Sequence, residues 1–326
     1  MRIVDLTAPG GEDNLVLSEA PTPSAGRGEL VIEVVAAGVN RADLLQRQGF
    51  YPPPPGISEV IGLEVSGRVH AIGEGVAGWT VGAECVALLA GGGYAEYVVV
   101  PAGQVIPPPP GVDLVTAAGL IEVAATVASN FDHVRLAAGE TVLIHGGAGG
   151  IGTFAIQYAR ALGARVLTTA GSAEKLELCR DLGVEVAIDY HDDWPAAVAE
   201  ATGGRGVDVI LDVMGAKYLE PNVAALAVDG RLVVIGLQGG RKGTLDLNRL
   251  LTRRATVTAT SLRFRPVEQK AEICRTVRDR VWPLIADGSI RPAPETRFAM
   301  ADVADAHRHL ASGANTGKVI LVVRPD

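Results

Sequence analysis

The stretch VLIHGGAGGIGTFAIQYAR, residues 142–160, contains three glycines in the spacing G-x-G-x-x-G: Gly147, Gly149 and Gly152. Forty of the 326 residues are glycine, so about one such match is expected by chance. A second set occurs at Gly73, Gly75 and Gly78. The segments that flank each set must therefore distinguish a dinucleotide-binding loop from an ordinary turn.

The Gly147 set lies between an apolar, β-branched strand, TVLIH, and a segment of helical period, IGTFAIQYARALG. Glycine allows the backbone to turn tightly and approach a diphosphate, and the N–H groups of the following helix bind the anion. The Gly73 set runs into WTVGAEC, which has no helical period and indicates a turn. The predicted pyrophosphate contacts are therefore Gly147, Gly149, Gly150, Ile151 and Gly152.

The end of the next strand, TTAGSAEK, determines the choice of cofactor. An NAD-specific site normally has a carboxylate here, about 20 residues after the glycines, bonded to the ribose hydroxyls. This strand has none, and Gly171, Ser172 and Lys175 occupy the position of a 2′-phosphate. A hydroxyl and an ammonium form charge-assisted bonds with phosphate, so the sequence predicts NADPH. The alternative is that Lys175 is a solvated lysine on the first turn of a helix.

Composition excludes several classes of protein. The formal net charge of −8 argues against binding nucleic acid. The N-terminus lacks the apolar core of a signal peptide, and no apolar run reaches the length of a membrane span. Three cysteines without a C-x-x-C pair indicate neither a disulfide framework nor a zinc knuckle. We expect a cytoplasmic protein.

The pattern of elements predicts two domains. Residues 1 to about 120 alternate short β-rich segments with Gly and Pro, as in a mostly antiparallel β domain. Strands and helices then alternate to about residue 262, which is typical of a doubly wound parallel sheet. A final strand, KVILVV, is expected to return to the first domain. The predicted boundaries are 1–122 with 263–326 for the catalytic domain, and 123–262 for the nucleotide-binding domain.

The run from Gly139 to Arg160 resembles the signature of quinone oxidoreductases of the zeta-crystallin type, a branch of the medium-chain dehydrogenase/reductase superfamily. The segments GVNRADLLQRQGFYPPPPG, LLAGGGYAEYVVVP and NTGKVIL match in the same order, and the chain is most similar to the tumour-suppressor-induced members. The resemblance implies an α/β protein in which a doubly wound Rossmann sheet is inserted into a GroES-like, mostly antiparallel β domain.

The resemblance also implies a site without metal. Zinc-containing alcohol dehydrogenases of this superfamily have a Cys and a His where this chain has Asn40 and Leu63. The six histidines show no shared ligand spacing and are expected to be surface or structural residues: His70, His133, His145, His191, His307 and His309.

Further cofactor contacts follow from the resemblance alone. Asn40 and Thr126 match residues near the nicotinamide, and Tyr190 matches one beside the 2′-phosphate. The remaining implied contacts are Gly236, Leu237, Leu262, Asn315 and Lys318. Lys318, a single lysine before a strand, is equally consistent with plain surface.

The implied activity is hydride transfer from NADPH to a quinone, which needs positioning rather than a metal. Catalytic candidates are Tyr51, Asn40 and Asp43. Tyr51 is expected to face the quinone or to pack on its proline loop, whereas Asp43 is better explained as a structural hydrogen bonder than as a base. Two alternatives remain: reduction of activated C=C bonds in enals or enones, and a noncatalytic NADPH-binding, crystallin-like or RNA-binding protein.

The segment ATVTATSL, residues 255–262, is expected to be the last strand of the nucleotide-binding sheet. It carries no charge, and such an edge is prone to association unless it is covered. The resemblance implies that two such edges pair in a homodimer.

Overall fold

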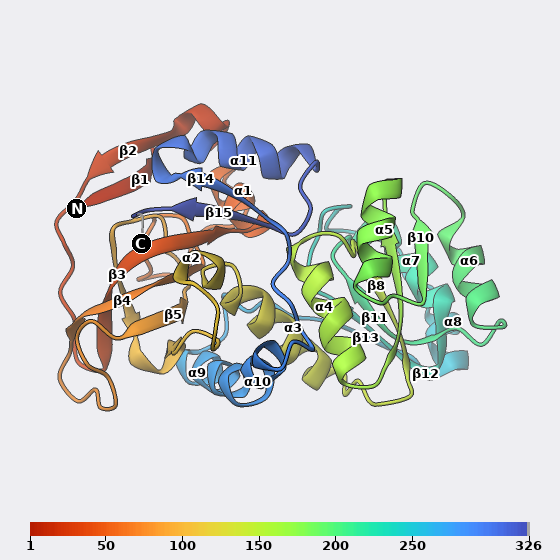
Figure 1. The fold of residues 1–326 in the computed structure, drawn as a ribbon. Coiled ribbons are helices and arrows are strands. Elements are labelled where there is room, and N and C mark those ends of the chain that lie inside the picture. The colour runs from red at the N-terminus through yellow and green to blue at the C-terminus, as the bar shows by residue number, and fades with distance from the viewer. Residues whose placement is uncertain (325–326) are drawn as a thin grey trace. The chain divides into compact units, whose positions relative to one another are not determined.

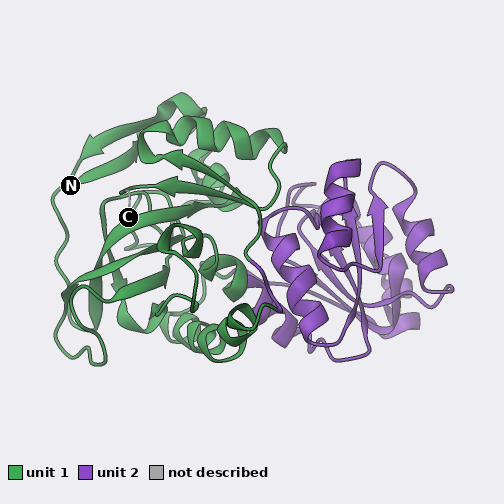
Figure 2. Cartoon of the chain, in the orientation of Figure 1, with its two compact units in different colours: residues 1–125, 262–288, 292–326 green, residues 126–261, 289–291 purple. Residues whose placement is uncertain are grey.

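The computed structural model describes residues 1–324 and divides them into two compact units. Unit 1 comprises Met1–Ala125, Leu262–Gly288 and Pro292–Asp326, and unit 2 comprises Thr126–Ser261 and Ser289–Arg291 (Figure 2). The chain therefore passes from unit 1 to unit 2 between residues 125 and 126 and returns between residues 261 and 262. The short segment Ser289–Arg291 also belongs to unit 2.

Unit 1 is built on a mostly antiparallel sheet in the order β14-β15-β3-β4-β5-β7, with β6 paired to β3. A separate two-stranded sheet joins β1 and β2. The strand bounds are β1 Arg2–Leu6, β2 Leu15–Glu19, β3 Glu29–Val39, β4 Glu64–Ile72, β5 Glu84–Leu88, β6 Tyr97–Pro101, β7 Val105–Ile106, β14 Glu295–Ala299 and β15 Lys318–Val322.

The C-terminal strand β15 lies beside β3, antiparallel, with Val319 opposite Val39 (Figure 1). Both strands are buried along nearly their whole length, and such apolar strands are stable only inside a sheet covered on both sides. The expectation that the last strand returns to the first domain is confirmed.

The helices of unit 1 are mostly short: α1 Arg41–Arg47, α2 Leu114–Ala117, α9 Val267–Thr276, α10 Trp282–Ala286 and α11 Val303–Ser312. The sequence suggested one long amphipathic segment over residues 266–288. The structure divides it into α9, a π-helical turn at Val277–Val281, and α10. Pro283 follows the π-helical turn within one unbroken helical stretch, and because it has no N–H to donate to the preceding turn, it interrupts the regular α-helical hydrogen-bond pattern there.

Unit 2 contains a parallel sheet in the order β10-β9-β8-β11-β12-β13. From β8 the next strands in the chain are added on one side of the sheet as far as β10, and from β11 they are added on the other side. This change of side is typical of doubly wound dinucleotide-binding folds, so the predicted fold class is confirmed. The strand bounds are β8 Thr141–His145, β9 Arg165–Ala170, β10 Val186–Asp189, β11 Val207–Asp212, β12 Leu226–Val234 and β13 Thr256–Ala259.

Helices connect the strands of unit 2: α4 Gly150–Ala161, α5 Ala173–Asp181, α6 Trp194–Ala201, α7 Ala216–Ala225 and α8 Leu247–Arg253, while α3 Ile121–His133 spans the boundary between the units. Trp194 of α6 and Tyr218 of α7 pack on buried strand residues such as Leu143 and Ile210. None of the described helices is long and apolar enough to cross a membrane.

Candidate active site

The glycine loop connects the end of β8 to the start of α4, and its three motif glycines differ in what surrounds them. A Cβ at Gly147 would lie 2.2 Å from Thr168 Oγ1, and one at Gly152 would lie 2.2 Å from the carbonyl oxygen of Gly146. At Gly149 the nearest atom would be 3.7 Å away. Gly147 and Gly152 are therefore required for packing within the loop, whereas the space beside Gly149 is open.

The first turn of α4 carries unpaired donors. Within residues 1–324, the backbone N–H groups of Gly150, Ile151 and Gly152 have no acceptor, and the first bonded N–H is that of Thr153, to the Gly149 carbonyl. Free N–H groups at a helix N-terminus, with the positive end of its dipole, form a binding site for an anionic diphosphate. The loop therefore fits the pyrophosphate of a dinucleotide.

The region expected to hold a 2′-phosphate follows β9. Ser172 is the N-cap of α5, and its hydroxyl accepts a hydrogen bond of 3.3 Å from the backbone N–H of Lys175. Tyr190 follows β10, which pairs with β9, and a Cβ at Gly171 would lie 2.2 Å from the Tyr190 hydroxyl. Gly171, Ser172, Lys175 and Tyr190 thus lie at one end of two neighbouring strands.

One carboxylate, Asp189, lies at the end of β10, opposite Ala170 in the register. Its oxygen accepts hydrogen bonds from the backbone N–H of His191, at 2.9 Å, and from the His191 ring, at 2.7 Å. The carboxylate is thus already engaged by His191. The absence of an acidic residue at the tip of β9, before Ser172, remains the feature that favours a phosphate.

Asp212 stabilises the loop that follows β11. It is fully buried, and its oxygens accept hydrogen bonds of 2.8 Å from the N–H groups of Met214 and Gly215; burial raises its pKa to about 6. Gly236 follows β12, and a Cβ there would lie 2.7 Å from the Val213 carbonyl oxygen. The next residue, Leu237, is half exposed, so its side chain is available to a ligand on unit 2.

A buried polar cluster in unit 1 joins Asn40, Glu64 and Lys318. The Lys318 ammonium donates to Glu64 Oε1 at 2.6 Å and to Asn40 Oδ1 at 2.8 Å, and Asn40 Nδ2 donates to Glu64 Oε1 at 2.9 Å. Glu64 also accepts from the N–H of Glu122. The amide oxygen and the amide nitrogen of Asn40 are thus both hydrogen-bonded, which fixes the side chain. Lys318 is buried and is not a surface lysine.

Asp43 lies next to this cluster and is completely buried. Its Oδ2 accepts from the N–H of Asn40 at 2.7 Å and from the Tyr94 hydroxyl at 2.9 Å, and Tyr94 in turn contacts His307. Burial raises the pKa of Asp43 to about 7. These contacts suit a structural carboxylate, and a catalytic role for Asp43 stays a prediction.

Tyr51 lies in the proline loop after α1 and contacts two side chains of the segment after β13. The Phe264 ring meets the Tyr51 ring edge to face, with 5.5 Å between centroids, and the Arg263 guanidinium lies 5.1 Å from the Tyr51 centroid. Leu262, which precedes them, is half-buried. The structure therefore gives Tyr51 an aromatic and a cationic neighbour.

Thr126 and Asn315 form hydrogen bonds within their own segments. Thr126, in α3, is mostly buried, and its carbonyl accepts from Asn130 Nδ2. Asn315, in the loop before β15, donates to the Gly317 carbonyl at 3.5 Å. Contacts of Thr126 and Asn315 with a cofactor stay predictions.

Sequence reasoning missed Glu64, Arg263 and Asp212. Each is a charged residue in an apolar or β-rich stretch, and such a residue is rarely buried without a specific partner. That pattern was visible in GLEVSG, SLRFRP and VILDV. The partners of Glu64 and Arg263 were not predictable, because they come from distant parts of the chain, whereas those of Asp212 are backbone N–H groups two and three residues away.

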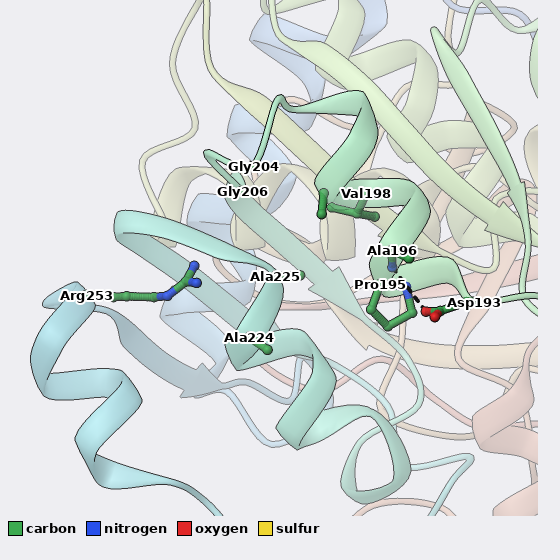
Figure 3. A pocket seen from close by; sticks show the side chains of 10 residues that line it. Asp193, Pro195, Ala196, Val198, Gly204, Gly206, Ala224, Ala225 and Arg253 are labelled. Atoms are coloured by element: carbon green, nitrogen blue, oxygen red, sulfur yellow. Dashed lines mark hydrogen bonds between the residues drawn. The ribbon is translucent and has the colours of Figure 1, made fainter.

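A cavity of about 390 Å³ in unit 2 is lined by none of the glycine-loop residues; Figure 3 shows its lining. Residues leading into the amino ends of β11, β12 and β13 contribute to its lining: Gly204, Gly206, Ala224, Ala225 and Arg253. In parallel sheets of this kind ligands bind at the carboxyl ends of the strands. The cavity therefore does not mark the cofactor site.

His145, at the end of β8, is buried and joins two neighbouring segments. Its Nε2 donates to Asn222 Oδ1 at 2.8 Å, and its Nδ1 accepts from the Thr169 hydroxyl at 3.0 Å. Burial lowers its pKa from 6.5 to about 4. Like His307, it is enclosed by protein, whereas the other four histidines are exposed or half-buried, and the described residues include no group of three potential metal ligands.

We expect the Hε1 resonance of His145 to titrate with a midpoint near pH 4, with His145→Gln used to assign it. Between about pH 6.5 and pH 4, the His145 imidazole is protonated in the unfolded chain but neutral in the folded unit. The contribution of His145 to stability is therefore complete above pH 6.5 and decreases as the pH falls toward 4. A midpoint at 6.5 would show that the ring is solvated.

Two family models match the chain. One, described as "Alcohol dehydrogenase GroES-like domain", matches residues 26–110, and one described as "Zinc-binding dehydrogenase" matches residues 150–275. They fall mainly in unit 1 and unit 2 respectively. The matches agree with the two folds described above.

Individual relatives cover nearly the whole chain. A Pseudomonas aeruginosa quinone oxidoreductase is 32% identical over 323 residues, which is 98% of each protein. A mycobacterial protein solved in complex with NADPH is 34% identical, with a TM-score of 0.91 and coverage of 99% of this chain and 100% of that one. A much longer relative is a phenolphthiocerol/phthiocerol polyketide synthase of Mycobacterium tuberculosis. The chain is 33% identical to it over 98% of its own length but spans only 15% of that protein.

The two domain matches, the strand order of unit 2 and the full-length similarity agree with one another. The chain belongs to the quinone oxidoreductase type of the medium-chain dehydrogenase/reductase superfamily.

Proposed function

We propose that the protein is an NADPH-dependent quinone reductase. The observation that carries the proposal is the open N-terminus of α4, where three unpaired N–H groups and the space beside Gly149 fit a diphosphate. The quinone oxidoreductase of Pseudomonas aeruginosa and the NADPH complex of the mycobacterial relative support the same assignment.

The nucleotide is expected to bind along the carboxyl ends of the unit 2 strands. The α4 N–H groups would hold the pyrophosphate, and Lys175, Ser172 and Tyr190 would surround the 2′-phosphate. Bound NADPH supplies the hydride at C4 of its nicotinamide. These residues of unit 2 would together hold the cofactor.

Unit 1 is proposed to supply the residues that face the acceptor. A quinone is already electrophilic, and water can protonate its reduced oxygens, so positioning is the main requirement. Asn40, held by Glu64 and Lys318, and Tyr51, held by Arg263 and Phe264, have fixed orientations within this unit. Fixed side chains lower the entropic cost of orienting a substrate.

The test is turnover of 9,10-phenanthrenequinone compared with that of an enal, each with NADPH and with NADH. We expect reduction of the quinone with NADPH and much slower reduction of the enal. Faster reduction of the enal would identify a reductase of activated C=C bonds instead. Cofactor binding without turnover of either substrate would indicate a noncatalytic NADPH-binding protein.

We expect the purified protein to contain no stoichiometric zinc, and chelators to leave its activity unchanged. The two positions that hold zinc ligands in related alcohol dehydrogenases are Asn40 and Leu63, and neither side chain is a zinc ligand. Asn40 is moreover bonded to Glu64 and Lys318. Elemental analysis showing one zinc ion per chain would overturn this expectation.

We also propose a homodimer formed through β13. This strand is the last of the unit 2 sheet and pairs with β12 on one side. Leu247 and Leu251 of helix α8, which leads into β13, are 69% and 77% exposed, and exposed apolar side chains are common at protein–protein interfaces.

Light scattering at micromolar concentration is therefore expected to give twice the 33.8 kDa mass of one chain. Thr256→Lys, at an exposed residue of the edge strand, should shift the equilibrium toward monomer, because pairing would bring a charged side chain into the strand interface. A monomer in the unmodified protein would refute the proposal.

The three cysteines, Cys85, Cys179 and Cys274, are free and buried. Unpaired thiols are usual in a reducing compartment. We accordingly propose that the protein acts in the cytoplasm.

A further inference from the structure

Arg263 is a buried cation without a carboxylate partner. Arg263 is only 4% exposed. Its three hydrogen bonds go to neutral oxygens: Nε to the Ala90 carbonyl at 2.6 Å, one terminal nitrogen to the Tyr51 carbonyl at 3.0 Å and the other to Gln46 Oε1 at 2.8 Å. Within residues 1–324 no carboxylate lies within ion-pair distance of it.

A guanidinium in this environment retains its full charge. Burial lowers the pKa of Arg263 from its usual value, and the charges of Asp43 and Glu59, which lie beyond ion-pair distance, partly offset that effect. An arginine side chain stays protonated in proteins even so. Burying a charge without a counter-ion is expensive, and the field of that charge extends further than it would in water.

The guanidinium lies next to Tyr51. It is bonded to the carbonyl oxygen of Tyr51 and lies 5.1 Å from the centroid of the Tyr51 ring. Phe264 contacts the same ring edge to face. Gln46, which binds Arg263, also donates to the Glu59 carbonyl at 2.9 Å, so residues on both sides of the proline loop are joined to the same arginine.

We propose that Arg263 is a positioning residue that fixes Tyr51 and, through it, places positive potential where the acceptor quinone becomes negatively charged. The proposal rests on the proposed quinone reductase activity. Reduction of the quinone would take one hydride, which is two electrons with one proton, from the C4–H bond of NADPH, leaving NADP⁺. The hydride forms an O–H bond at one quinone oxygen, both carbonyl π bonds are lost as the aromatic ring forms, and the other oxygen becomes negative. That oxygen then takes a second proton from water. A preorganised positive charge stabilises that anion more than the neutral quinone, so it should raise kcat.

The experiment is a double-mutant cycle on the full chain, with 9,10-phenanthrenequinone as the acceptor and saturating NADPH. The variants are Arg263→Met, Tyr51→Leu and the combination. Arg263→Met is expected to lower kcat about tenfold, less than the loss of a donor in direct contact with the anion. The dissociation constant of NADPH, measured by fluorescence titration, should change less than about twofold, because the Arg263 side chain bonds to Ala90, Tyr51 and Gln46, none of which is an expected cofactor contact.

In the Tyr51→Leu background, Arg263→Met should have a clearly smaller effect on kcat, because the part of its effect that depends on fixing the Tyr51 ring is absent. Arg265→Met is the matched control and should leave kcat unchanged, since the side chain of this nearby arginine, among the described residues, bonds only to Gln269, at 3.4 Å. If Arg263→Met does not fold, Arg263→Lys takes its place in the cycle; it keeps the charge but loses the fork of donors, so a kcat loss of about threefold is expected.

Equal effects of the Arg263 substitution in both backgrounds would overturn this proposal while leaving the proposed function intact. So would a rise in the NADPH dissociation constant that matches the loss of activity. Wild-type protein that reduces no quinone would overturn both proposals.

Discussion

Replacing Lys318 by methionine is expected to lower the free energy of unfolding by about 3 to 5 kcal/mol, because it removes one partner of a buried ion pair. Glu64 has no exposed surface, and the Lys318 ammonium lies 2.6 Å from its carboxylate oxygen. In the variant the carboxylate would keep two neutral donors, Asn40 and the N–H of Glu122. These donors do not neutralise its charge.

Urea unfolding followed by tryptophan fluorescence measures this effect, since Trp79 and Trp282 lie in unit 1. Arg68→Met is the matched control: its salt bridge to Glu84, at 3.0 Å, also lies in unit 1 but is well exposed, so the loss should be below about 1 kcal/mol.

Adding Glu64→Gln to Lys318→Met should restore about half of the lost stability, because the unpaired charge is removed. A loss for Lys318→Met no larger than that for Arg68→Met would mean that the pair contributes nothing beyond a surface contact.

Much of the fold was predictable from local sequence. TVLIH, RVLTTA and VDVILD coincide with β8, β9 and β11, because apolar β-branched runs between glycine-marked turns have few alternative structures. The period of IGTFAIQYARA likewise marks α4. The strand that returns to unit 1 was predicted from its position after the doubly wound region.

The candidate site was predictable only in part. The glycine loop is local in sequence, so its geometry followed from spacing and flanks. The contacts of Lys318 with Glu64 and of Arg263 with Gln46 join residues more than 200 positions apart. No periodicity encodes such pairs, because they depend on how segments from the two ends of the chain meet in one unit.

The structure also changes how the choice of cofactor should be tested. An acidic residue at the tip of β9, as in Gly171→Asp, should repel a 2′-phosphate and accept bonds from the ribose of NADH. Its Cβ would, however, lie 2.2 Å from the Tyr190 hydroxyl and displace that ring. Gly171→Ala is therefore needed as a control that displaces Tyr190 without adding a charge.

Lys175→Ala avoids this difficulty. If the ammonium contacts the 2′-phosphate, its removal should raise the NADPH dissociation constant by about ten- to a hundredfold, since hydrogen bonds to charged groups contribute roughly 1.5 to 3 kcal/mol. NADH binding should be almost unchanged, because NADH has no group at that position. Tyr190→Phe should act in the same direction, more weakly.

Fluorescence titration of both cofactors measures these effects, with two variants for comparison. Arg180→Ala removes a positive charge from the same helix, where Arg180 is paired with Glu177, and should alter neither dissociation constant. Gly149→Ala should weaken NADPH and NADH alike, at least about tenfold, because its methyl group fits the loop but fills the space for the pyrophosphate. If Lys175→Ala instead weakens both cofactors equally, as Gly149→Ala does, the lysine supports the loop rather than recognising the phosphate, and the preference for NADPH must arise from other residues.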